Sequence, residues 1–250
     1  MKRHEMIGIK QAIRFEWMEK ACELMGADKP KEEIRQELKD YLSDRMGRGT
    51  IQKRSETARD FAVVILMRTW VTPETFLVPM RNEAVSHLFR ASGDERLAIH
   101  HGMISAAYPF WYAVSRQIGA LFRLQDQITV RQIVQRTKEV YGDRQTVERN
   151  TQFVIRSLYY WGFLKETGTT GCYQKGRVHI ISSDMLRRWM IEAQLHAIPE
   201  GRANLSALQN DPALFAFDIP YVSGATVTRH HKRLDLMQNG FSDDMVMLKF

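Results

Sequence analysis

Four polar side chains suited to nucleic acid recur at helical spacing in GDRQTVERNTQFVIRSLYYWGFLKET, residues 142–167. They are separated by four, three and four residues and are Gln145, Arg149, Gln152 and Arg156. At about 100° per residue they share one face of a helix, and the apolar residues Val147, Val154, Leu158 and Trp161 share the opposite face. Arginine and glutamine are donors that suit phosphates and base edges. The spacing predicts an amphipathic helix whose polar face contacts nucleic acid.

The positive charge of the chain is concentrated around this stretch. The sequence of 250 residues has a formal net charge of +7, and residues 129–177 hold nine basic and four acidic side chains. Such an excess is an electrostatic footprint for polyanions, and the alternative is an asymmetric solvated surface. A second basic segment, residues 44–60, is either a surface loop or a flexible contact to a nucleic-acid backbone through Arg48, Lys53 and Arg54.

No catalytic motif accompanies the basic face. The sequence lacks GxxxxGK[ST], GxGxxG, HExxH and GxSxG, the motifs of phosphate-binding loops, zinc proteases and serine hydrolases. Adjacent histidines on a helix point about 100° apart, so His100–His101 and His230–His231 are expected on helix or strand surfaces rather than on one metal ion. We therefore expect a protein that is not an enzyme and has no catalytic residues, metal or cofactor.

The cysteines and the hydropathy of the sequence indicate the cellular compartment. Cys22 and Cys172 lie far apart and form no CxxC pair, so packing roles and a reducing cytoplasm are expected. The N-terminal stretch carries charges throughout, and the longest apolar run, FAVVILM, is too short to span a bilayer. These features predict a soluble, cytoplasmic protein without a membrane partner, and none of them indicates the oligomeric state.

The elements that would position the basic face are mainly helical. In the N-terminal half, amphipathic patterns predict helices, the first over residues 8–26, and Pro109 is expected to end or kink a central helix. Further on, Thr129 and Gln132 have capping-box spacing, and Asp143 is expected to cap the next helix. FLKET and CYQKGRVHII then predict two short strands joined by GTTG.

The order of elements in residues 110–181 resembles a winged helix-turn-helix domain. ITVRQIVQRTKEVYG matches its second helix, DRQTVERNTQFVIRSLYYWGFLKE its third and GFLKETGTTGCYQKG its wing. The resemblance implies that the third helix enters the DNA major groove and that the wing touches the backbone. Base contacts are then expected from Gln145, Arg149 and Gln152. The expected backbone and wing contacts are Arg144, Arg156, Lys165, Thr169, Thr170 and Lys175.

An acidic residue and several aromatic residues lie in the same region of the sequence as this basic face. Glu148 departs from the pattern, because it would repel phosphate or accept a hydrogen bond from a cytosine amino group. Among the aromatic residues, Trp161 lies on the apolar stripe and is expected in the core, as are Phe110, Trp111 and Tyr112. Tyr160 points nearer the arginine face and is expected to flank DNA.

A similarity in layout covers more of the chain. A small, basic, mainly helical protein with RTWV…ERLAIHHGMISAAYPFWYAV in its middle and a winged-helix-like part is similar to the BrxA family of bacterial BREX phage-defence systems. This similarity implies a DNA-binding accessory protein without catalysis of its own.

The sequence predicts a mainly α protein with a helical N-terminal domain (1–109), a winged helix-turn-helix (110–181) and a C-terminal helix with a small mixed α/β lobe (182–250). The predicted function is non-enzymatic binding of double-stranded DNA, as an accessory protein of a phage-defence system. Two alternatives stay open. One is a protein–protein adaptor in a multi-subunit system, with the winged helix as its interaction module, and the other is RNA binding by the helical domain.

Overall fold

The computed structural model describes residues 3–27, 29–43, 55–229, 232–238 and 243–249. Helices make up 62% of the structure and strands 11%, so the prediction of a mainly α protein is confirmed. Some residues singled out in the sequence lie outside the described ranges, namely Arg48, Lys53, Arg54, His230 and His231.

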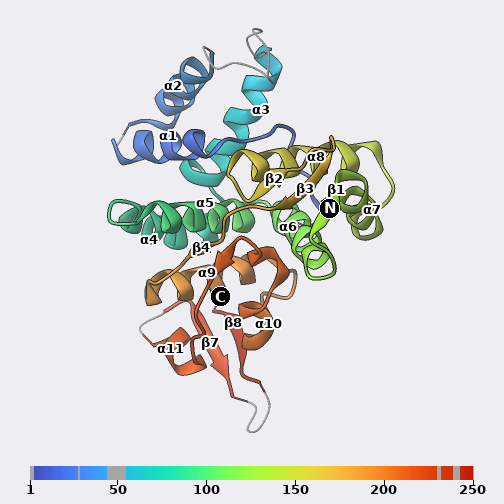
Figure 1. Ribbon diagram of the computed structural model, residues 1–250. Coiled ribbons are helices and arrows are strands. Elements are labelled where there is room, and N and C mark those ends of the chain that lie inside the picture. Colours follow the sequence, from blue (N-terminus) through green and yellow to red (C-terminus); the bar gives the residue numbers. More distant parts are fainter. Residues whose placement is uncertain (1–2, 28, 44–54, 230–231, 239–242, 250) are drawn as a thin grey trace.

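The N-terminal part is built from helices, with α1–α3 at the top of Figure 1 and α4–α6 across its middle. The helices are α1 (Phe15–Gly26), α2 (Lys31–Ser43), α3 (Glu56–Leu66), α4 (Val78–Leu88), α5 (Gly93–Ala107) and α6 (Pro109–Phe122). Shorter helical segments are η1 (Arg3–Glu5), η2 (Met67–Val71) and η3 (Thr75–Leu77). Within the described ranges no single helix is long and apolar enough to cross a membrane; the bent pair Glu56–Val71 and Thr75–Leu88 meets the requirement by length and composition only.

The first helix begins at Phe15 rather than at residue 8 as predicted. The backbone N–H of Ile13 donates to Ser157 Oγ at 2.9 Å, and Trp161 Nε1 donates to the Ile13 carbonyl at 3.0 Å. These contacts use backbone groups that a helix would need for its own hydrogen bonds. The apolar spacing of Ile9 and Ile13 reflects burial in a non-helical segment, since both side chains are 0% exposed.

The predicted contact residues are carried by the elements that follow α6. These elements are β1 (Gln127–Thr129), α7 (Val130–Tyr141), α8 (Gln145–Tyr160), β2 (Leu164–Glu166) and β3 (Cys172–Lys175). The strands form one antiparallel sheet in the order β1-β3-β2, in which Ile128 lies opposite Tyr173 and Lys165 opposite Gln174. The two strands predicted after α8 are therefore present and paired, although β3 ends at Lys175.

The capping residue predicted for α7 is present, whereas the one predicted for α8 is not. The capping box of α7 is confirmed, because Thr129 Oγ1 accepts from the Gln132 N–H and Gln132 Oε1 accepts from the Thr129 N–H. The N-cap of α8 is Arg144, which makes no side-chain capping bond. The prediction that Asp143 caps α8 is wrong, because its carboxylate lies 3.0 Å from Lys138 Nζ on α7.

The C-terminal part combines one long helix with short strands, at the bottom of Figure 1. Its elements are β4 (His179–Ile180), α9 (Asp184–Ala197), β5 (Arg202–Asn204), α10 (Leu205–Gln209), η4 (Pro212–Leu214), β6 (Phe217–Asp218), α11 (Gly224–Thr228), β7 (Leu234–Met237) and β8 (Met245–Leu248). β4 and β6 pair in parallel, and the C-terminal sheet has the antiparallel order β5-β8-β7. Helix α11 begins after Ser223, whose Oγ accepts from the Thr226 N–H and caps the helix.

One hydrophobic core runs from Ile9 to Phe217 and includes residues on both sides of the predicted boundary at 109/110. Of the aromatic residues expected to be buried, Phe110, Trp111 and Trp161 belong to this core, and Tyr112, 3% exposed, packs with Ala197 and Ala213 in a small separate cluster. A second cluster joins α9 to the C-terminal sheet through Leu195 and Val246, both 0% exposed. The mixed C-terminal part thus has a small core of its own.

The prediction that His100 and His101 lie on a surface is wrong, since they are 0% and 2% exposed. His100 Nε2 lies 2.6 Å from Glu19 Oε1, and Trp111 Nε1 donates to His101 Nδ1 at 3.3 Å. Both histidines are buried because α5 is packed on several sides, so directions 100° apart on this helix both lead into the core.

Candidate nucleic-acid interface

The polar side of α8 faces solvent. Gln145, Arg149 and Gln152 are exposed, and Arg156 is partly buried. The apolar residues of the opposite side are 0% exposed and are Val147, Val154 and Leu158. Helical spacing therefore groups Gln145, Arg149, Gln152 and Arg156 on one surface, called here the α8 face.

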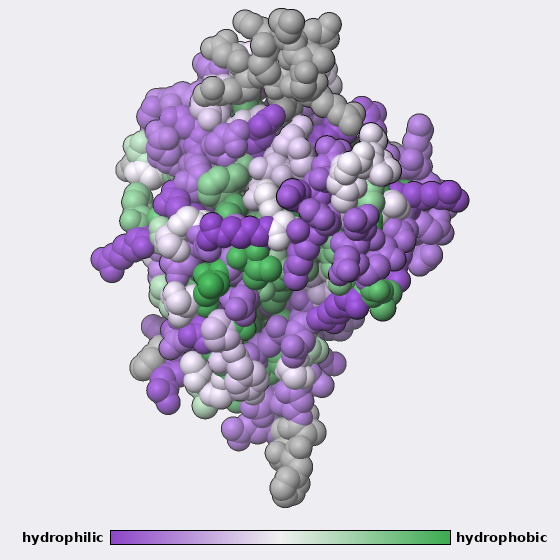
Figure 2. Space-filling view, viewed as in Figure 1, coloured by the Kyte–Doolittle hydropathy of each residue, from purple (hydrophilic) through white to green (hydrophobic). Residues whose placement is uncertain are grey.

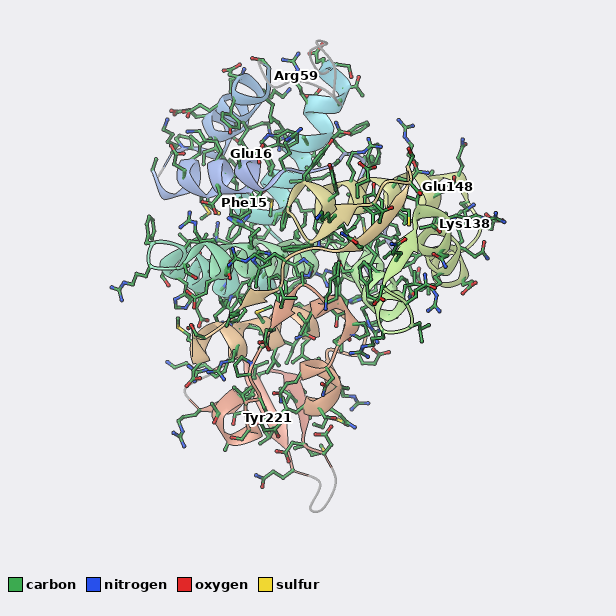
Figure 3. The ribbon with its side chains drawn as sticks, in the orientation of Figure 1. Phe15, Glu16, Arg59, Lys138, Glu148 and Tyr221 are labelled. Atoms are coloured by element: carbon green, nitrogen blue, oxygen red, sulfur yellow. The ribbon has the colours of Figure 1, made fainter. Side chains whose placement is uncertain are left out.

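Glu148, the only acidic residue of α8, is engaged by the neighbouring helix. Lys138 Nζ on α7 lies 2.9 Å from Glu148 Oε2 and 3.0 Å from Asp143 Oδ1. Hydrogen bonds to Glu148 and to Asp143 raise the pKa of Lys138. Figure 3 shows Lys138 and Glu148 close together where α7 meets α8. Local pairing therefore weakens the repulsion that Glu148 would exert on a phosphate at the α8 face.

The β2–β3 hairpin presents the second group of predicted contacts. Its exposed polar residues are Lys165, Thr169, Thr170 and Lys175. The Thr167 N–H donates to the Cys172 carbonyl at 3.0 Å and closes the turn, in which Gly171 has a φ of 74°. Tyr159 of α8 contacts Tyr173 of β3, with ring centroids 6.0 Å apart. The hairpin consequently flanks the C-terminal end of the α8 face.

Arg144 lies apart from the α8 face. Its Nη2 donates to the Tyr141 carbonyl at 2.8 Å, and its side chain lines a cavity of about 450 Å³ together with Arg116 and Ile198. This cavity is bordered by α6, α7 and the end of α9. Arg144 is therefore the predicted helix contact whose side chain does not belong to the α8 face.

Arg14, which the sequence did not indicate, lies on the other side of α8, and Lys10 of the same segment lies over α3. The Arg14 guanidinium carbon lies 4.2 Å from the ring centroid of Tyr160, and Lys10 Nζ lies 5.4 Å from the ring centroid of Phe61 on α3. Lys10 is exposed, and the Arg14 side chain is 36% exposed. No local pattern connects residue 14 with residue 160, so this proximity appears only in the folded chain.

Metal ligation and thiol chemistry find little support in the described part of the chain. No group of three or more histidine, cysteine, aspartate or glutamate side chains there is placed to hold a metal ion. Cys22 is buried, and burial raises the pKa of its thiol, while Cys172 is partly buried in β3. A thiol held protonated is a poor nucleophile, which fits the packing role expected of Cys22.

Comparison of the chain with protein-family models, with curated proteins and with solved structures gives no match.

Proposed function

We propose that residues 110–181 form a winged helix that binds double-stranded DNA, with α8 in the major groove and the β2–β3 hairpin on the backbone. The element order α6-β1-α7-α8-β2-β3 and the sheet order β1-β3-β2 support this proposal, because they are the arrangement expected of such a domain. On the layout similarity to the BrxA family, the protein acts without catalysis, as an accessory component of a bacterial phage-defence system.

The observation that carries the proposal is the composition of the α8 face. Arg149 and Gln152 are exposed near its middle, and the nearby carboxylate of Glu148 is paired with Lys138. A helix of about 10–12 Å diameter fits a major groove about 12 Å wide. Arginine contacts guanine and glutamine contacts adenine through two hydrogen bonds each, so both residues suit base reading.

Reversal of one charge on the α8 face tests the proposal. We expect the wild-type protein to bind a random-sequence duplex with an affinity that falls steeply with salt. Arg149→Glu should lower this affinity about tenfold or more, because it removes a cation and adds an anion at the groove. Arg202→Glu, on the exposed edge of β5, makes the same charge change in the C-terminal sheet and should leave binding unchanged.

Two results would contradict the proposal. The first is no salt-dependent binding of duplex DNA by the wild-type protein, and the second is an equal loss of affinity in Arg149→Glu and Arg202→Glu. Tighter binding of RNA than of duplex DNA in the same titration would instead support the alternative of RNA binding by the helical domain.

A protein–protein adaptor is the second candidate, and exposed apolar side chains near β4 favour it. Val178 and Ile180 are 41% and 62% exposed. Figure 2 shows hydrophobic surface near the middle of this face, at the level of β4 in Figure 1. An adaptor does not need the charge of the α8 face, so its complex should survive Arg149→Glu and be weakened by Ile180→Asp.

A further inference from the structure

We infer that the segment Lys10–Arg14 is a second phosphate-contacting element, placed beside α8 on the flank opposite the β2–β3 hairpin. This inference rests on the proposed DNA-binding function and adds to it a contact to the second DNA strand. It assigns a binding role to Lys10 and Arg14, which lie far from the winged helix in sequence.

The segment is fixed to α8 by its backbone. The N–H of Ile13 donates to Ser157 Oγ, and the Ile13 carbonyl accepts from Trp161 Nε1, so both polar groups of one residue are used. The Ile13 side chain is 0% exposed, which leaves Lys10 and Arg14 as the basic residues of the segment that reach the surface. Their position relative to α8 is therefore set by the fold, as a preformed contact requires.

Two consecutive tyrosines show that the segment and the hairpin lie on different flanks of α8. Neighbouring helical residues point about 100° apart. Tyr159 contacts Tyr173 of the hairpin, with ring centroids 6.0 Å apart. The guanidinium carbon of Arg14 instead lies 4.2 Å from the ring centroid of Tyr160. By helical spacing Arg156 lies between these two directions, so the α8 face is bordered by the hairpin on one side and by the segment on the other.

The charges of the segment are directed to aromatic rings more than to carboxylates. Lys10 lies over Phe61 and Arg14 over Tyr160, while the acid beside Arg14 is Glu16, with Nη1 and Oε1 3.9 Å apart. Glu16, labelled in Figure 3 at the start of α1, is itself 55% exposed in its side chain. Stacking on a ring orients a guanidinium and leaves its N–H edge available to phosphate oxygens.

This placement fits the geometry of a duplex. A helix in the major groove has the phosphates of one strand on one side and those of the other strand on the other side. The hairpin, with Lys165 and Lys175, would contact one backbone, and Lys10 and Arg14 would contact the other. Contacts to both backbones fix the angle at which α8 enters the groove, which is the positioning role of phosphate contacts.

The salt dependence of duplex binding tests the inference by counting phosphate contacts. We would compare the wild type with Lys10→Gln/Arg14→Gln and with the matched control Arg202→Gln/Arg229→Gln, which removes two exposed cations from the C-terminal part. Each lost phosphate contact lowers the slope of log affinity against log salt by about 0.9, so the slope of Lys10→Gln/Arg14→Gln should fall by about 2. Lys10→Arg/Arg14→Lys, which keeps both charges, should retain the wild-type slope, and urea unfolding of each variant would verify folding.

The outcomes separate this inference from the proposed function. If Arg149→Glu loses binding while Lys10→Gln/Arg14→Gln keeps the wild-type slope, the α8 contact stands and the segment has no contact to phosphate. An equal fall of the slope in the C-terminal control would also overturn the inference, because it would show a general effect of net charge. If the wild-type protein does not bind duplex DNA, the proposed function fails and the inference fails with it.

Discussion

At the scale of single residues, Lys138 pairs with the carboxylate of Glu148, which borders the α8 face. Its Nζ is 2.9 Å from Glu148 Oε2, and the Lys138 side chain is 20% exposed. We expect Lys138→Met to weaken duplex binding roughly threefold to tenfold, because the carboxylate of Glu148 would then repel the DNA. Adding Glu148→Gln to that variant should restore most of the loss in a fluorescence titration. If the second substitution restores nothing, Lys138 acts by contacting DNA itself and not through Glu148.

His101 gives the free energy of unfolding a pH dependence. Burial lowers the pKa of His101 from 6.5 to about 4, so the unfolded chain binds this proton more readily than the folded protein does. The contribution to stability is complete above pH 6.5 and is lost as the pH falls towards 4, on the order of 3 kcal/mol in all. His101→Gln keeps an acceptor for Trp111 Nε1 and removes the titration. Between pH 7 and pH 4.5, urea unfolding should therefore show a larger fall in the free energy of unfolding for the wild type than for His101→Gln. An equal fall in both proteins would contradict the titration of His101.

At the scale of elements, the sequence was most informative where a structure depends on neighbouring residues. The α7 capping box and the break before Pro109 were predicted because they depend on residues within a single turn. The start of α1 was not, because the Ile13 N–H donates to Ser157 and the Ile13 carbonyl accepts from Trp161, two distant residues that engage the backbone there. For the candidate site the same holds. Helical periodicity predicted which residues of α8 share an exposed face, whereas the contact of Lys138 with Glu148 depends on how two helices pack.

The approach of α6 to η4 leads to a prediction about element packing. A Cβ atom at Gly119 would lie 1.8 Å from the carbonyl oxygen of Pro212, so an added methyl group must push the backbone of η4 away. We expect Gly119→Ala to lower the free energy of unfolding by about 1–2 kcal/mol, despite the better helix propensity of alanine. Gly168→Ala is the control, because a Cβ there meets nothing within 4 Å. Urea denaturation would measure both, and identical stabilities would show that α6 and η4 separate at no cost.

At the scale of the whole molecule, an ion-pair cluster connects the C-terminal sheet to the helices above it. Arg233, just before β7, has its Nε 2.6 Å from Glu192 Oε1 and its Nη2 2.7 Å from Glu192 Oε2, and it also donates to Glu83 of α4. Glu192 on α9 is 0% exposed. Hydrogen bonds to Glu192 raise the pKa of Arg233 further above its ordinary value. The cluster therefore connects three segments that are distant in sequence.

Loss of the Arg233 guanidinium alone should destabilise the protein more than loss of both charges of the Arg233–Glu192 pair. Arg233→Met breaks the pair with Glu192, whose carboxylate keeps the contact to His196 Nε2 at 3.6 Å. Removing one partner of a buried charge costs about 3 kcal/mol. Arg233→Met/Glu192→Leu removes the buried charge as well, so urea unfolding should show it to be more stable than Arg233→Met alone. Additive losses would mean that Glu192 is stabilised independently of Arg233. Because the cluster contains no residue of the α8 face, both variants should bind duplex DNA like the wild type while folded, and weaker binding would reveal coupling between the C-terminal sheet and α8.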